Sequence, residues 1–155
     1  MTVALWTGPP IGAMRSGFLA VSGCRPPSGI HNQAPCWDTY RHIIADVRAY
    51  IAAAGLRVVH GGAEGVDQAA GSSEVWLPDY GLHGRAAPLI RNAYVTTTER
   101  FCAWPAPWSR GTWDAIKQRA AACGAVGMEI RMVEDVCPAD VRALLREKGA
   151  TWRRI

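Results

Sequence analysis

The chain has 155 residues and a net charge of +4, and 49% of its residues are hydrophobic against 19% charged. This length suits one domain with a real core and is too short for two, and the composition excludes a largely disordered chain. All but two of the 17 basic residues are arginines, whose planar guanidinium groups match phosphate, so the charge favours anionic partners. An arginine-rich surface that serves only solubility would explain the same charge.

The cysteines and histidines give no sign of a metal site. Five cysteines, an odd number without C-x-x-C spacing, argue against a disulfide framework and a zinc site. His31, His42 and His83 lack metal-ligand spacing, and we expect no cofactor. No window approaches the ~20 uninterrupted apolar residues of a membrane helix, so we expect a cytoplasmic protein without membrane contact.

The first third of the chain predicts an irregular arm, a buried strand and a long helix. Residues 1–17 are rich in Gly and Pro and predict an irregular N-terminal arm, although Val3 to Trp6 has the pattern of an edge strand. An apolar run over 18–22 predicts a buried strand, and a loop follows over 23–36. Apolar residues at helical spacing over 37–54 predict an amphipathic helix.

The second half continues this alternation. A strand over 56–60 leads into a glycine turn and the start of a helix, with Asp67 at the N-cap position. The later strands are expected over 74–78, 101–104 and 126–132, and the later helices over 86–98, 112–123 and 138–149. Strands that alternate with helices predict one α/β domain with a three-layer, Rossmann-like fold, in which helices cover both faces of about five parallel strands.

Three loops that follow strands carry residues suited to a phosphate. They are Ser22-Gly23-Cys24-Arg25, Gly61-Gly62-Ala63-Glu64-Gly65 and Ser109-Arg110-Gly111-Thr112. Glycines allow close backbone approach, and the free N–H groups of a helix start attract anions. A tight turn and an ordinary Ser/Thr cap would explain the second and third loops without a ligand. Because loops after parallel strands meet at one rim, the three together predict a phosphate-binding cleft.

These motifs resemble the SLOG superfamily, the Rossmann-like group that includes the LOG phosphoribohydrolases, the DNA-processing protein DprA, molybdenum-cofactor carriers and the YspA-like proteins. The resemblance covers roughly residues 18–132 and is greatest to YspA-like members. It rests on Val-Ser-Gly-Cys-Arg (21–25), His-Gly-Gly-Ala-Glu-Gly-Val-Asp (60–67), Ile-Arg-Asn (90–92) and Gly-Thr-Trp-Asp (111–114). It implies a nucleotide-type small molecule as partner and a homo-oligomer.

The sequence resembles the LOG enzymes less well at their catalytic residues. Arg91 looks like the functional arginine of LOG enzymes, but Ala115 stands where their glutamate would be. Cleavage of a nucleoside monophosphate needs a carboxylate to stabilise an oxocarbenium-like centre or to orient water. Glu64 and Asp114 are the candidate carboxylates, so the catalytic candidates are Arg91, Glu64 and Asp114.

The leading hypothesis is a sensor or carrier that binds a nucleotide or nucleotide-derived ligand. The predicted ligand-binding residues are Gly23, Cys24, Arg25, Gly61, Gly62, Ala63, Gly65, Arg91, Asn92, Ser109, Arg110, Gly111 and Thr112. One alternative is a LOG-like phosphoribohydrolase acting on nucleoside 5′-monophosphates. A second is a DprA-like single-stranded DNA-binding module, which the modest charge and the lack of a long basic stripe disfavour.

Overall fold

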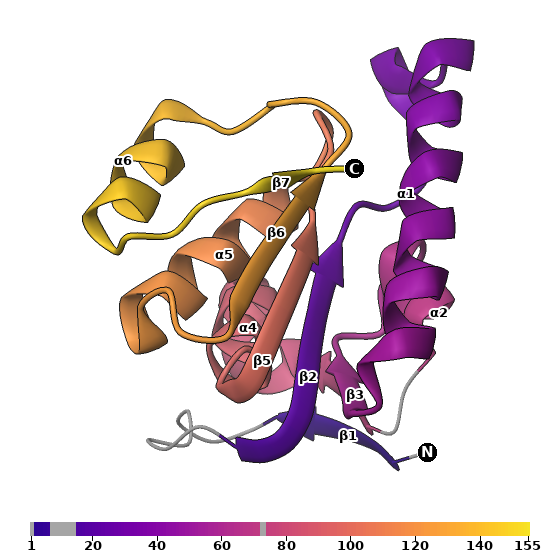
Figure 1. Ribbon diagram of the computed structural model, residues 1–155. Coiled ribbons are helices and arrows are strands. Elements are labelled where there is room, and N and C mark those ends of the chain that lie inside the picture. Colours follow the sequence, from indigo (N-terminus) through magenta and orange to yellow (C-terminus); the bar gives the residue numbers. More distant parts are fainter. Residues whose placement is uncertain (1, 7–14, 72–73) are drawn as a thin grey trace.

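The computed structural model describes residues 2–6, 15–71 and 74–155. At its centre is a sheet of seven parallel strands in the order β1-β4-β3-β2-β5-β6-β7 (Figure 1). The strands are β1 (Thr2–Trp6), β2 (Arg15–Gly23), β3 (Arg57–His60), β4 (Glu74–Pro78), β5 (Thr98–Trp104), β6 (Met128–Met132) and β7 (Arg153–Arg154). From β2 to β4 each new strand is added on one side, whereas β5 and β6 are added on the other, so the strand order reverses between β2 and β5.

Helices cover both faces of the sheet. In Figure 1, α1 (Ala34–Ala54) and α2 (Val66–Ala70) lie on one side, and α4 (Ala87–Val95), α5 (Arg110–Cys123) and α6 (Ala139–Glu147) lie on the other. The short helix α3 (Tyr80–His83) and the 3₁₀ turns η1 (Gly29–His31) and η2 (Gly84–Ala86) complete the chain. No helix in the described ranges is long and apolar enough to cross a bilayer.

The alternating side chains of β2 build two cores. Leu19 and Val21 pack with Ile43 and Val47 of α1 on one face of the sheet. Ala20 belongs to the other core, together with residues of α5 and α6. The period of two along a strand sends neighbouring residues to opposite faces, and burial on both faces is the reason that β2 is apolar from Phe18 to Val21. The central part of this strand is therefore covered on both faces, and burial decreases again at Ser22 and Gly23, at its carboxyl end.

The predicted α/β fold, with a parallel sheet between two helical layers, is confirmed, but the described residues form seven strands rather than about five. The prediction of an irregular arm over 1–17 is wrong at both ends. Thr2–Trp6 forms β1, which pairs with β4 at the sheet edge, as the alternative reading of Val3 to Trp6 allowed. The first residues of β2, Arg15 to Gly17, also fall in the predicted arm, and residues 7–14 lie outside the described ranges.

Other boundaries differ by a few residues for local reasons. Helix α1 begins at Ala34 rather than at residue 37 because Pro35 fits the first turn of a helix. The predicted helix over 86–98 ends at Val95, and the fully buried guanidinium of Arg119 donates to the carbonyl oxygens of Thr96, at 2.7 Å, and Thr98. These carbonyls are thus satisfied by a side chain rather than by a further helical turn. Strand β7 was not predicted, because two arginines carry no strand signal.

Candidate functional site

A cavity of about 180 Å³ opens beyond the carboxyl ends of β2, β3 and β5, at the point where the strand order reverses. In parallel α/β sheets this is the position where ligands bind. Eleven of the thirteen predicted ligand-binding residues line it: Gly23, Cys24, Arg25, Gly61, Ala63, Arg91, Asn92, Ser109, Arg110, Gly111 and Thr112. Gly62 and Gly65 do not line it. The three loops that the sequence singled out therefore meet at one cavity, as the topology predicts.

The cavity is also lined by residues outside the predicted ligand-binding set. Asp67, Leu89, Val95 and Thr96 contribute to its wall, and so does Trp108. Val95 belongs to α4 and follows Arg91 by four positions, so the two residues lie on the same face of that helix. An amphipathic reading of α4 around Arg91 could have found Val95. Leu89, two positions before Arg91, does not share that face and carried no such signal.

The loops after β2 and β3 touch each other through their backbones. Val66 donates its N–H to the carbonyl oxygen of Cys24 at 3.2 Å. A Cβ atom on Gly65, whose φ is +91°, would lie 2.4 Å from the same oxygen, and one on Gly23 would lie 2.5 Å from the Val66 side chain. Two of the motif glycines are thus required by the contact between the loops.

The glycine turn is fixed by two buried side chains. His60 accepts a hydrogen bond from the Gly62 N–H at Nδ1, over 2.9 Å, and Asp67 accepts one from the Ala63 N–H at Oδ2, over 3.1 Å. These amides are already engaged, so this turn shapes the cleft wall rather than offering the N–H groups of Gly62 and Ala63 to a phosphate. The prediction that Asp67 is the N-cap of the following helix is wrong: the N-cap is Gly65, and the carboxylate of Asp67 folds back onto the turn.

Burial is the main cause that shifts the pKa values of Asp67 and His60 in this turn. Burial raises the pKa of Asp67, and the nearby His60 acts in the opposite direction. Burial lowers the pKa of His60, although the Asp67 carboxylate, 3.9 Å from Nδ1, opposes this shift. The hydrogen bond from Gly62 needs an unprotonated Nδ1, so the geometry and the lowered pKa both favour neutral His60.

Arg91 projects from α4 across the end of the glycine turn. Its Nη1 donates to the carbonyl oxygens of Gly61, at 2.8 Å, and Trp76, at 3.1 Å, and its Nε donates to Asn92 Oδ1 at 3.0 Å. A Cβ atom on Gly61 would lie 2.0 Å from Nη1, so the glycine makes room for the guanidinium. These bonds use Nε and Nη1, whereas Nη2 makes none with a described residue. Arg91 thus reaches the cavity with two N–H groups to spare.

The start of α5 forms the opposite wall. Its N-cap residue, Ser109, makes no capping bond to the helix, because its hydroxyl accepts from the Ala106 N–H at 2.9 Å instead. The first turn contains no acidic residue. Arg110, Gly111 and Thr112 line the cavity, and a Cβ atom on Gly111 would meet no atom within 4 Å. The positive end of a 14-residue helix therefore faces open space in the cleft.

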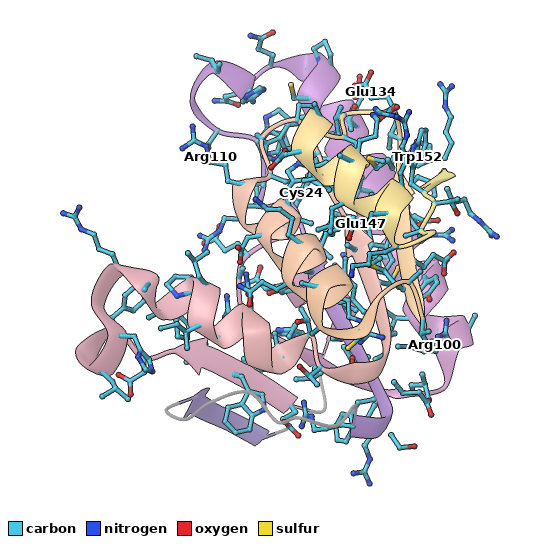
Figure 2. All side chains as sticks on the ribbon, turned by 90° about the vertical axis from the view of Figure 1, so that its left-hand side faces the viewer. Cys24, Arg100, Arg110, Glu134, Glu147 and Trp152 are labelled. Atoms are coloured by element: carbon cyan, nitrogen blue, oxygen red, sulfur yellow. The ribbon has the colours of Figure 1, made fainter. Side chains whose placement is uncertain are left out.

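Trp108 joins the segment before α5 to the loop after β2, at the mouth of the cavity. Trp108 donates from Nε1 to the carbonyl oxygen of Arg25 at 2.7 Å, and its ring centre lies 5.7 Å from that of His31. Figure 2 shows Arg110 extending from the beginning of α5, with Cys24 behind the same end of that helix. Cys24 is buried, and burial raises its pKa to about 12, so its thiol stays protonated at neutral pH.

The two candidate catalytic carboxylates lie outside the lining. Asp114 accepts hydrogen bonds from Asn92 Nδ2, at 3.1 Å, and from Gln118 Nε2, at 2.9 Å. Glu64 is exposed, and neither residue lines the cavity. Ala115 does line it, and Asp67 is the one carboxylate among the described lining residues. A catalytic role for Arg91, Glu64 or Asp114 stays a prediction.

The fold and the cleft define a Rossmann-like α/β protein with a candidate ligand site at its topological switch point. No protein-family model matches the chain, and a search of curated proteins finds no match. Among solved structures, DNA processing protein A from Helicobacter pylori, studied for its single-stranded DNA binding mode, is similar to this chain. Its TM-score is 0.57 at 16% identity, over 87% of this chain and 74% of that one. This likeness shows a shared fold.

The contact between the two loops predicts which glycine the protein needs. Gly65→Ala should lower the free energy of unfolding by about 3 kcal/mol, because the new methyl group would strike the Cys24 carbonyl oxygen in a backbone conformation that alanine rarely adopts. Gly111→Ala, which places the same methyl group in open space, should change it by less than about 1 kcal/mol. Urea unfolding measures both. Equal stability of the two variants would contradict the role given to Gly65.

His60 predicts a pH-dependent stability. In the folded protein the pKa of His60 lies below its ordinary value of 6.5. The unfolded chain therefore binds a proton at this histidine more tightly than the folded protein does, and the free energy of unfolding falls as the pH drops below 6.5. Wild type should therefore lose more stability between pH 6.5 and about pH 5 than His60→Asn, whose amide oxygen can accept from Gly62 at every pH. Asp67 and Arg91, the charged groups that act on His60, are present in both proteins. Parallel stability curves over this range would show that His60 does not titrate as described.

Proposed function

We propose that this chain binds the phosphate group of a nucleotide or nucleotide-derived ligand in the cleft and acts as a sensor or carrier of that ligand. The observation that carries the proposal is the pairing of Arg91 with the start of α5 at one cavity. Arg91 brings a guanidinium whose Nη2 makes no hydrogen bond with a described residue, and α5 brings backbone N–H groups that its N-cap side chain does not cap. Both favour a phosphate over a neutral ligand.

Arg91 is suited to a ligand because its position is fixed before binding. Three hydrogen bonds to Gly61, Trp76 and Asn92 hold the guanidinium, so little side-chain entropy remains to be lost when a phosphate binds. Burial lowers its pKa, which reflects the cost of an incompletely compensated positive charge. A phosphate would supply the missing negative charge.

The positions of the carboxylates near the cleft support ligand binding rather than hydrolysis of the ligand. Asp67, which lines the cavity, already accepts from Ala63, and burial raises its pKa. Asp114 is engaged by Asn92 and Gln118, and Glu64 faces solvent. A LOG-like phosphoribohydrolase would need one of these groups to reorient toward the sugar. Release of free base from a panel of nucleoside 5′-monophosphates would support that alternative.

Single-stranded DNA is the second candidate ligand because the similar DNA processing protein A binds it. A strand that uses this cleft would place a backbone phosphate at the same Arg91 and α5 positions. The cavity of about 180 Å³ suits the phosphate and sugar end of a single nucleotide better than a run of bases. Competition between AMP and a labelled oligothymidine for the protein would distinguish the two ligands.

Gly111→Asp tests the phosphate position without disturbing the fold. The substitution puts a negative charge into open space at the start of α5, where it suits the helix dipole and repels a phosphate. Calorimetry should show that AMP binds wild type and that its affinity falls at least about tenfold in Gly111→Asp. Gly111→Asn has the same size without the charge and should bind AMP several-fold more tightly than Gly111→Asp. Equal affinities of the Asp and Asn variants would refute the phosphate position.

A further inference from the structure

The mouth of the cleft carries two arginines that the proposed phosphate position does not use. Arg25 lies in the loop after β2, and Arg110 is the first residue of α5. Both line the cavity and both are exposed. Within the described ranges neither side chain makes an ion pair or a hydrogen bond, in contrast to Arg15, Arg131 and Arg142, which hold carboxylates. The two guanidinium groups at the mouth are therefore available to a ligand.

The backbones below these two side chains are held together. Trp108, two residues before Arg110, donates from Nε1 to the carbonyl oxygen of Arg25. The preceding carbonyl, that of Cys24, accepts from Val66, so the Arg25 backbone is tied to two neighbouring loops. Figure 2 shows the Arg110 side chain reaching outward from the start of α5 rather than back onto the helix. The backbones of Arg25 and Arg110 are thus held by neighbouring loops, whereas their guanidinium groups are not held by a described residue.

One of the outer arginines, Arg25, is close enough to the inner arginine to affect its pKa. Burial is the main cause that lowers the pKa of Arg91, and the like charge of Arg25 adds to it, whereas Asp67 acts in the opposite direction. Three arginines therefore line one small cavity, whose lining contains only Asp67 as a described carboxylate. A single phosphate bound by Arg91 and α5 would leave the two outer guanidinium groups without an anionic partner.

We infer that the cleft takes a ligand with two adjacent phosphoryl groups, such as a nucleoside diphosphate. One phosphoryl group binds at the inner position, next to Arg91 Nη2 and the first turn of α5. The second binds at the mouth between Arg25 and Arg110, whose planar donors match its terminal oxygens. This inference rests on the proposed function, because it places the first phosphoryl group at the same position.

The test compares one phosphoryl group with two. Calorimetry in EDTA measures AMP against ADP, and inorganic phosphate against pyrophosphate so that the result does not depend on the base. Wild type should bind ADP at least about tenfold more tightly than AMP, and pyrophosphate more tightly than phosphate. In Arg25→Gln/Arg110→Gln, ADP affinity should fall to the AMP level while AMP affinity changes less than about threefold.

The control is Arg48→Gln/Arg85→Gln, which removes the same charge from exposed arginines that do not line the cleft and should keep the preference for ADP. A preference for ADP that survives in Arg25→Gln/Arg110→Gln would overturn the inference. Equal binding of AMP and ADP by wild type would overturn it as well and leave the proposed function intact. If wild type binds none of the four probes, both proposals fail.

Discussion

The site depends on one close backbone contact, the hydrogen bond from the Val66 N–H to the Cys24 carbonyl oxygen. It joins the loop after β2 to the loop after β3 at a separation that only glycine at positions 23 and 65 permits. Once these loops are fixed, the Arg25 backbone has a defined position, and Trp108 connects it to the start of α5. The three loops then enclose a cavity instead of separating at the end of the sheet.

Hydrogen bonds within the glycine-rich turn give it a different role from that of a simple phosphate cradle. His60 and Asp67 take the N–H groups of Gly62 and Ala63, and the carbonyl oxygen of Gly61 accepts from Arg91. The turn therefore holds the Arg91 side chain at the cleft, while the first turn of α5 has no capping bond from its N-cap side chain. In the proposed binding mode, the phosphate is shared between Arg91 of α4 and the first turn of α5, which both line the cavity.

The sequence was sufficient to predict the α/β fold and the meeting of three loops at one cavity, because both follow from short-range patterns. Strands that alternate with helices predict parallel order, and parallel order places the loops around residues 23, 61 and 111 at one rim. The capture of the Gly62 amide by His60, and of the Ala63 amide by Asp67, was not predictable, because it depends on which way two buried side chains turn. The same limit applies to Arg119, whose carbonyl contacts end α4 before Thr96.

The proposed binding mode places a nucleotide phosphate between Arg91 and the first turn of α5. Chemical shifts recorded by NMR during titration with AMP locate the bound phosphate. The largest shifts should fall on the amides of Gly111 and Thr112 and on the Arg91 guanidinium, and Gly62 and Ala63, whose amides are engaged within the turn, should shift less. Shifts centred on Gly62 and Ala63, or on residues far from the cleft, would contradict it.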